Sequence, residues 1–281
     1  MVLKHFGATL AQVCFIYSGG SELVVEVRGD GSATASAAPE LERWAGLDRD
    51  ARTGPHAGGR ARSGPREWGV SGHHQGVTEQ RCEALLCDVD GVLRHWDKAA
   101  VARLEQEFGL PAGTIAAVAF APAQLAPALT GHISDEQWRA EIAHHLTPHC
   151  GSTARASRLV ELWSRDLGRV DDDVLRLLVR VQRVIPVALV TNATTRLERD
   201  LELLGVTNVI PRVVSSARVG RAKPDPAIYR AGLQLVGVPA NRCLFVDDAP
   251  ENVLAAQALG MAGLAYRALA ELRRALEPVL A

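Results

Sequence analysis

Short apolar runs alternate with amphipathic stretches over the second half of the chain. The apolar runs predict strands at 185–190, 213–214, 243–246 and 263–266, and the amphipathic stretches predict helices at 195–204, 226–235 and 250–259. Strands that alternate with helices of about 10 to 15 residues favour right-handed crossovers and a parallel sheet. The pattern therefore predicts an α/β fold with helices on both faces of the sheet.

An earlier apolar run ends at Cys87 and is followed at once by two carboxylates, Asp88 and Asp90, and then by Gly91. This pattern is typical of a buried strand that ends in a polar loop. Taken alone, a simple acidic turn is the preferred interpretation, because Asp-x-Asp-Gly turns are common. In parallel sheets, however, ligands bind beyond the carboxyl ends of the strands.

Helical periodicity dominates the stretch 98–183. Ser134 and Gln137 resemble a capping box at the start of a helix, and Pro148 is expected to end that helix. We therefore expect an all-helical cap at 96–183, inserted between the two parts of a core domain at 81–95 and 184–281.

The segment 1–80 is rich in Gly, Ser, Ala and Arg and has little periodicity. This composition predicts a poorly ordered extension without a core of its own. A short hairpin near Val24–Val27, followed by a turn at 29–31, is the one regular feature expected. A natural start near Val77 is an alternative, because folding signals begin only at Glu83.

The chain has 281 residues and 47% hydrophobic content, which is enough for a substantial core. A net charge of -1 gives no electrostatic argument for nucleic acid or an anionic membrane as a partner. No apolar run reaches the about 18 residues of a membrane span. Five scattered cysteines suit reduced thiols in a cytoplasmic protein. Composition thus favours a small-molecule partner and leaves the oligomeric state open.

Polar residues suited to phosphate or metal chemistry follow the other predicted strands as well. They are Thr191, Asn192, Lys223, Asp247 and Asp248. One active site at the carboxyl edge of the sheet explains these residues together with Asp88 and Asp90 better than independent polar turns do.

In chain order, these residues resemble the four motifs of the haloacid dehalogenase-like hydrolase superfamily, in members with a helical cap after the first motif. The motifs are Asp88-Val89-Asp90-Gly91-Val92, Val190-Thr191-Asn192, Lys223-Pro224-Asp225-Pro226 and Val246-Asp247-Asp248-Ala249-Pro250. The resemblance extends from Glu83 to the C-terminus and is nearest to the branch that includes the N-terminal phosphatase-like domain of epoxide hydrolases. It implies a Rossmann-like core and a Mg2+-dependent phosphatase acting on a small phosphorylated metabolite.

The resemblance also implies roles for the motif residues. Asp88 is expected to be the nucleophile that forms an aspartyl-phosphate, and Asp90 the general acid and then the general base. Lys223 is expected to bridge the phosphate and Asp88. The Thr191 hydroxyl and the Asn192 backbone N–H are expected to bind phosphoryl oxygens.

Mg2+ is expected to bind oxygen ligands from Asp88, Asp248 and the backbone carbonyl of Asp90. Asp247 is expected to hold Lys223 or a metal-bound water. The division of roles between Asp247 and Asp248 stays open.

Asp90 argues against dehalogenation, which in this superfamily needs no general acid at that position. A phosphomutase would use the same core, and a helical cap alone does not separate the two activities. A third alternative is a binding or regulatory module without turnover. The complete set of motif residues argues against that alternative.

Several residues outside the central motifs leave two interpretations open. Trp96 and His95 follow the nucleophile loop and suit either contact with a leaving group or a packing role. Asn252 suits either orientation of the fourth motif or an ordinary helix position. His144, His145, His149 and Cys150 resemble a transition-metal cluster, but a surface helix end is preferred because Pro148 interrupts their spacing.

Overall fold

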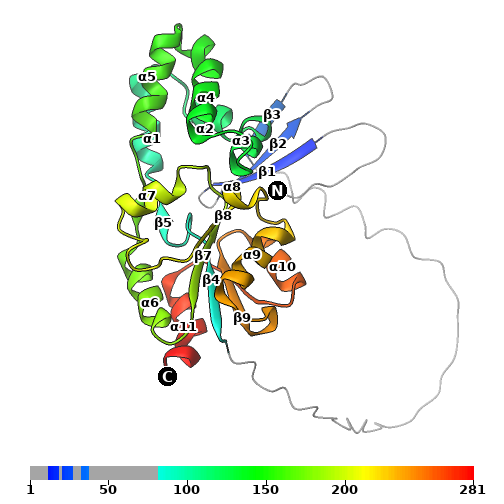
Figure 1. Cartoon of the computed structure of the whole chain (residues 1–281). Coiled ribbons are helices and arrows are strands. Elements are labelled where there is room, and N and C mark those ends of the chain that lie inside the picture. Colours follow the sequence, from blue (N-terminus) through cyan, green and yellow to red (C-terminus); the bar gives the residue numbers. More distant parts are fainter. Residues whose placement is uncertain (1–11, 19–20, 28–32, 38–81) are drawn as a thin grey trace, which may run out of the picture. The chain divides into compact units, whose positions relative to one another are not determined.

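The computed structural model describes residues 12–18, 21–27, 33–37 and 82–281 (Figure 1). The chain divides into two units, residues 1–77 and 78–281. The first unit holds a three-stranded antiparallel sheet of β1 (Gln12–Ser18), β2 (Ser21–Val27) and β3 (Ala33–Ala37).

Only part of the prediction for the N-terminal segment falls on described residues. The hairpin expected near Val24–Val27 coincides with β2 and β3, whereas β1 was not predicted. The expected turn at 29–31 lies outside the described residues. The natural start near Val77 stays a prediction.

The second unit is built on a sheet of five parallel strands in the order β10-β9-β4-β7-β8. The strands are β4 (Ala84–Cys87), β7 (Val187–Thr191), β8 (Val213–Ser215), β9 (Cys243–Asp247) and β10 (Ala262–Ala265). Because β4 lies between β9 and β7, the carboxyl ends of these three strands lie side by side. The predicted α/β, Rossmann-like fold is confirmed.

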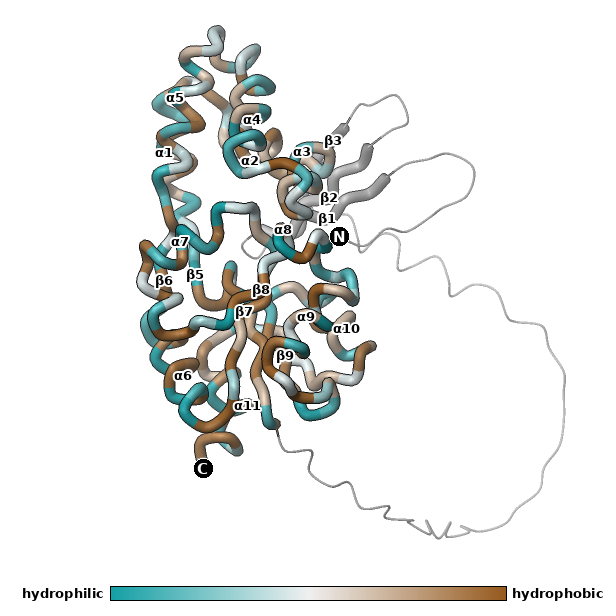
Figure 2. The backbone as a smooth tube through the Cα atoms, in the orientation of Figure 1, coloured by the Kyte–Doolittle hydropathy of each residue, from teal (hydrophilic) through white to brown (hydrophobic). Residues whose placement is uncertain are grey.

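Helices cover both faces of this sheet (Figure 1). One face packs against α6 (Asp172–Gln182), α7 (Leu197–Leu203) and α11 (Leu269–Leu280), and the other against α9 (Pro226–Val236) and α10 (Pro250–Ala258). Leu85 of β4 lies on the first face and Leu86 on the second, as the two-residue period of a strand requires. Each fully buried leucine stabilises the fold by about 2 kcal/mol. The hydrophobic strands thus form the centre of the core domain (Figure 2).

The cap has five helices and a core of its own. They are α1 (Lys98–Glu107), α2 (Thr114–Ala119), α3 (Pro122–Leu129), α4 (Asp135–Cys150) and α5 (Thr153–Trp163). Their apolar side chains form one cluster around Trp138, Ile142 and Leu146. The predicted capping box of Ser134 and Gln137 opens α4 and is confirmed.

The cap is shorter than the sequence analysis expected. The sequence analysis extends the cap to residue 183, but Val174, Leu177, Leu178 and Val181 of α6 pack against the sheet. Periodicity identifies an apolar stripe on a helix but does not identify the surface that buries it. The cap therefore ends before β6 (Arg169–Val170), which pairs antiparallel with β5 (Arg94–His95).

The base of the cap contacts the loop that follows β7. The Asp135 backbone N–H donates to Thr195 Oγ1 at 2.9 Å, and the Thr194 hydroxyl donates to Asp135 Oδ1 at 2.7 Å. Asp135 is the first residue of α4, so these bonds tie the start of that helix to the core. They place the cap at the carboxyl edge of the sheet.

The expected break at Pro148 was wrong, because α4 continues through this residue to Cys150. A proline conflicts with the carbonyl group four residues earlier, and a position in the last turn limits the distortion to that one carbonyl. The histidines of α4 are exposed, as the surface interpretation predicted, and His145 Nε2 lies 2.8 Å from Gln124 Nε2. In the described part of the chain, no helix is both long and apolar enough to span a membrane.

Candidate active site

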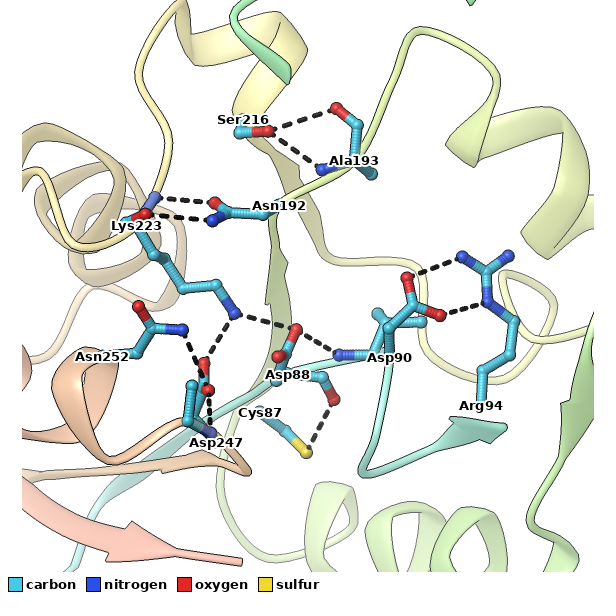
Figure 3. A network of polar contacts seen from close by, with 12 residues as sticks. Cys87, Asp88, Asp90, Arg94, Asn192, Ala193, Ser216, Lys223, Asp247 and Asn252 are labelled. Atoms are coloured by element: carbon cyan, nitrogen blue, oxygen red, sulfur yellow. Dashed lines mark hydrogen bonds and ion pairs between the residues drawn. The ribbon is translucent and has the colours of Figure 1, made fainter. Parts of the chain in front are cut away.

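The polar residues of the four motifs meet at the carboxyl edge of the sheet. Strands β4, β7 and β9 end at Cys87, Thr191 and Asp247, and the loops that follow them carry Asp88, Asp90, Asn192 and Asp248. Lys223 lies in the loop between α8 (Ser216–Val219), which follows β8, and α9. Asp88, Asp247 and Lys223 lie close together there, with Asn192 beside Lys223 (Figure 3). The structure thus gathers residues that are far apart in the sequence.

A buried cation lies at the centre of this site. Lys223 is 5% exposed, and its Nζ lies 2.9 Å from Asp88 Oδ1 and 2.6 Å from Asp247 Oδ2. Burial alone would lower the pKa of Lys223, but the two carboxylates outweigh it and raise the pKa. Lys223 therefore stays charged and links the two aspartates.

Asp88 is a buried carboxyl group with a perturbed pKa. Burial raises its pKa to about 7, the Lys223 charge opposes this shift, and Asp247 adds to it. The Val89 backbone N–H also donates to Asp88 Oδ1, at 2.7 Å. Strong perturbation of this kind is common among reactive groups.

Asp247 is completely buried, and the surrounding groups hold both of its oxygens. Lys223 contacts Oδ2, while Oδ1 accepts from the Ala249 N–H at 2.9 Å and from Asn252 Nδ2 at 3.0 Å. The Tyr229 hydroxyl donates to the Asn252 carbonyl group at 2.9 Å. The structure therefore favours the orienting interpretation of Asn252.

Three carboxylates form a compact oxygen cluster. One oxygen each from Asp88, Asp247 and Asp248 lies within 4.8 Å of the others, and this is the one such group among the described residues. Burial, followed by the charge of Asp247, raises the pKa of Asp248. Carboxylate oxygens are ligands that Mg2+ prefers, so the donor set fits this ion.

Gly91 allows the loop that follows β4 to pass close to this cluster. Its φ is +87°, and a Cβ at this position would lie 2.1 Å from Asp248 Oδ2. A side chain of any size would therefore displace the Asp248 carboxylate. This contact gives a physical reason for the glycine that follows Asp90.

The Asn192 side chain has a role that the sequence analysis did not predict. Its Nδ2 donates to the Lys223 carbonyl group at 3.0 Å, and its Oδ1 accepts from the Lys223 N–H at 2.6 Å. This amide holds the backbone of Lys223 in place. Thr191 is buried at the end of β7, and phosphate binding by Thr191 and the Asn192 backbone stays a prediction.

Asp90 points away from Asp88 and toward Arg94 (Figure 3). Arg94 Nε lies 2.7 Å from Asp90 Oδ1, and Arg94 Nη2 lies 2.9 Å from Oδ2. Trp96 Nε1 also donates to Oδ1, at 2.9 Å. The sequence analysis missed Arg94, because an arginine four residues after a carboxylate is common on protein surfaces and carries no functional signal by itself.

Two nearby residues lie apart from the cluster. Arg221 is exposed and its Nε lies 3.7 Å from Asp225 Oδ2. His95 Nε2 lies 3.8 Å from Asp171 Oδ2, beside the start of α6. These contacts favour a packing role for His95.

Comparison with known proteins gives one family. Residues 82–260 match the haloacid dehalogenase-like hydrolases. The chain is 25% identical over 184 residues to validoxylamine A 7'-phosphate phosphatase of Streptomyces hygroscopicus subsp. limoneus, covering 64% of this chain and 83% of that protein. It is 34% identical over 90 residues to hexitol phosphatase A of Escherichia coli (strain K12), covering 32% of this chain and 42% of that protein.

A solved structure shows the same fold. It is a variant of a haloacid dehalogenase-family enzyme from Bacteroides thetaiotaomicron in complex with magnesium and inorganic phosphate. The TM-score is 0.54 at 18% identity, over 68% of this chain and 98% of that one. The closer likeness to the N-terminal domain of epoxide hydrolases stays a prediction.

Proposed function

The chain belongs to the haloacid dehalogenase-like hydrolases, and we propose that it is a Mg2+-dependent phosphatase that hydrolyses a small phosphorylated metabolite through an aspartyl-phosphate on Asp88. The observation that carries this proposal is the buried contact of Lys223 with both Asp88 and Asp247. A nucleophilic carboxylate repels a phosphate ester, so a phosphatase of this type needs fixed positive charge beside the nucleophile. Lys223 has that position.

The oxygen cluster supports a divalent cation as the second positive charge. Asp88, Asp248 and the backbone carbonyl of Asp90 would hold Mg2+, which when bound neutralises charge on the phosphoryl oxygens. Asp247 has a different role in this proposal. Because Lys223, Ala249 and Asn252 engage both of its oxygens, Asp247 orients the lysine.

The first step is attack by Asp88 on phosphorus. Lys223 and the Val89 N–H both contact Oδ1, so we assign the attack to Oδ2. A bond forms between Oδ2 and phosphorus while the bond from phosphorus to the ester oxygen breaks. Asp90 gives its proton to that oxygen, which leaves as an alcohol.

Hydrolysis of the aspartyl-phosphate completes the cycle. Asp90, now a carboxylate, takes a proton from a water molecule as the water oxygen bonds to phosphorus. The bond from phosphorus to Asp88 then breaks and releases phosphate. Thr191 and the Asn192 backbone N–H are proposed to bind the phosphoryl oxygens in both steps.

The nature of the relatives supports a small substrate. Validoxylamine A 7'-phosphate phosphatase and hexitol phosphatase A are named for phosphorylated small molecules. The four described cysteines are free, which supports a reducing compartment such as the cytoplasm. A net charge of -1 gives no support for nucleic acid as the substrate.

The test is release of phosphate from a generic aryl phosphate and from a panel of sugar, nucleotide and glycolate phosphates. Wild type is expected to turn over with Mg2+ and to stop when EDTA is added, and Asp88→Asn is expected to be inactive. Asp173→Asn, which removes an exposed carboxylate on α6, is the matched control. Absence of EDTA-sensitive turnover on every substrate would overturn the proposal.

A further inference from the structure

Arg94 is a buried arginine that none of the four motifs includes. It is 4% exposed, and its N–H donates to the Val89 carbonyl group at 2.8 Å. The Gly91 N–H donates to the Arg94 carbonyl group at 2.9 Å. These bonds close the loop after the nucleophile and bring the Arg94 side chain next to Asp90.

The Asp90 carboxylate is held on both oxygens. Arg94 binds it with two parallel N–H donors, the geometry that gives the strongest orientation of a carboxylate. The Trp96 indole adds a third donor, and the Arg94 guanidinium lies 4.6 Å from the centre of the Trp96 ring. Oδ1 therefore accepts from two donors and Oδ2 from one, which leaves a lone pair of Oδ2 for a transferred proton.

The same arginine touches both chain segments that connect the cap to the core. Arg94 lies in β5, within the first connection, and pairs in register with Val170 of β6 in the second. A Cβ on Gly168 would lie 2.8 Å from Arg94 Cγ, so the second connection passes directly over the arginine stem. Displacement of either connection would displace Arg94.

A series of ion pairs and a hydrogen bond connects Arg94 to the last helix of the cap. Arg94 Nη1 lies 3.9 Å from Asp200 Oδ2, and Arg196 Nε lies 2.6 Å from Asp200 Oδ1. Arg196 Nη1 then donates to the Ser164 carbonyl group at 2.8 Å, at the end of α5. These contacts join Asp90 to the base of the cap by a second route.

We propose that Arg94 is the positioning residue of the general acid. It orients the Asp90 carboxylate, and it couples the distance between that carboxylate and the leaving-group oxygen to the position of the two cap connections. The inference rests on the proposed function, in which Asp90 protonates the leaving group. In the conformation seen here the carboxylate is turned away from Asp88. In this proposal, a movement of the connections would carry Arg94, and Asp90 with it, toward the ester oxygen.

The proposal separates Arg94 from a purely structural residue through the leaving group. A good leaving group departs without a proton, whereas a poor one needs the acid, whose transfer accelerates reactions about 100- to 10,000-fold. A displacement of about 1 Å in a catalytic group costs roughly 100-fold in rate. Loss of Arg94 should therefore slow the cleavage of poor leaving groups selectively.

The experiment measures kcat/KM on a series of substituted phenyl phosphates, from p-nitrophenyl phosphate to phenyl phosphate. Arg94→Met and Asp90→Asn are both expected to lose at least about tenfold more activity on phenyl phosphate than on p-nitrophenyl phosphate. Gly168→Ala, which presses on the arginine stem, is expected to show the same selectivity. Arg176→Met, which removes an exposed arginine of α6, is the control with no selectivity.

An equal loss on every member of the series, or no loss, would overturn the proposal. A second readout needs neither turnover nor metal: the indole 1H–15N signal of Trp96, identified with Trp96→Phe. Arg94→Met and Asp90→Asn are expected to shift this signal, and Arg176→Met is expected to leave it in place. If wild type turns over no phosphate ester, the proposed function fails, whereas an unchanged indole signal in Arg94→Met refutes the positioning role by itself.

Discussion

Replacement of the buried lysine by a neutral side chain of similar length, Lys223→Met, probes the electrostatics of the site most sharply. Asp88 and Asp247 are 6% and 0% exposed, and both contact Lys223 within 3 Å. In the variant, two neighbouring carboxyl groups lose the cation that neutralises them. Removal of one partner of a buried ion pair costs about 3 to 5 kcal/mol of unfolding free energy.

Protonation of Asp88 in Lys223→Met reduces this loss of unfolding free energy. Its pKa is about 7 with Lys223 in place, and loss of the lysine charge raises it further. In the variant, Asp88 therefore binds a proton in the native state at pH values where the unfolded chain does not. At pH 8 we expect a loss of about 3 kcal/mol, equivalent to roughly 6 to 12 °C in Tm for a domain of this size.

Urea unfolding in EDTA at pH 6 and pH 8 measures this effect. The deficit of Lys223→Met relative to wild type should be smaller at pH 6, because protonation of Asp88 removes one of the two unpaired charges. Arg176→Met breaks an exposed ion pair and should cost less than about 1 kcal/mol at both pH values. A Lys223→Met loss no larger than that of Arg176→Met would refute the electrostatic argument.

Three further predictions concern the same edge of the sheet. Gly91→Ala should weaken Mg2+ binding at least about tenfold in calorimetry, because its Cβ would lie 2.1 Å from Asp248 Oδ2; unchanged affinity would contradict the contact. The affinity for Mg2+ should rise with pH up to about 7 and then level, because a proton on Asp88 competes with the ion below its pKa; a flat profile from pH 5.5 to 8 would count against the raised pKa. Asn192→Ala removes both hydrogen bonds to the Lys223 backbone and should lower kcat roughly tenfold or more. The circular dichroism spectrum should stay native-like, and full activity would show that these two hydrogen bonds are not needed.

The sequence predicted the sheet, and the grouping of the motif residues at one of its edges, for physical reasons. Buried parallel strands are continuous apolar runs, and the polar residues that follow them are conspicuous. Because parallel strands align their carboxyl ends, the sequence alone predicts that Asp88, Lys223 and Asp247 lie at the same edge of the sheet. The structure brings these three residues into direct contact.

The misses came from contacts between residues distant in the chain or from features without a distinctive pattern. Helix α6 has a clear apolar stripe, but nothing local distinguishes a stripe buried by the sheet from one buried by the cap. The Asn192 amide holds a backbone that follows 31 residues later. Arg94 is distinguished by its burial and by the backbone of Gly168, which lies against its side chain, and neither feature can be seen in the sequence.

The covalent step on Asp88 is the central claim, and acid-quench trapping tests it most directly. Protein is mixed with a 32P-labelled phosphate ester and Mg2+, quenched in acid within one turnover, and digested for peptide mapping. Label should appear on the peptide that contains Asp88, should be released by hydroxylamine as an acyl phosphate is, and should be absent from Asp88→Asn. Turnover of the ester without any label on this peptide at any quench time would contradict the account.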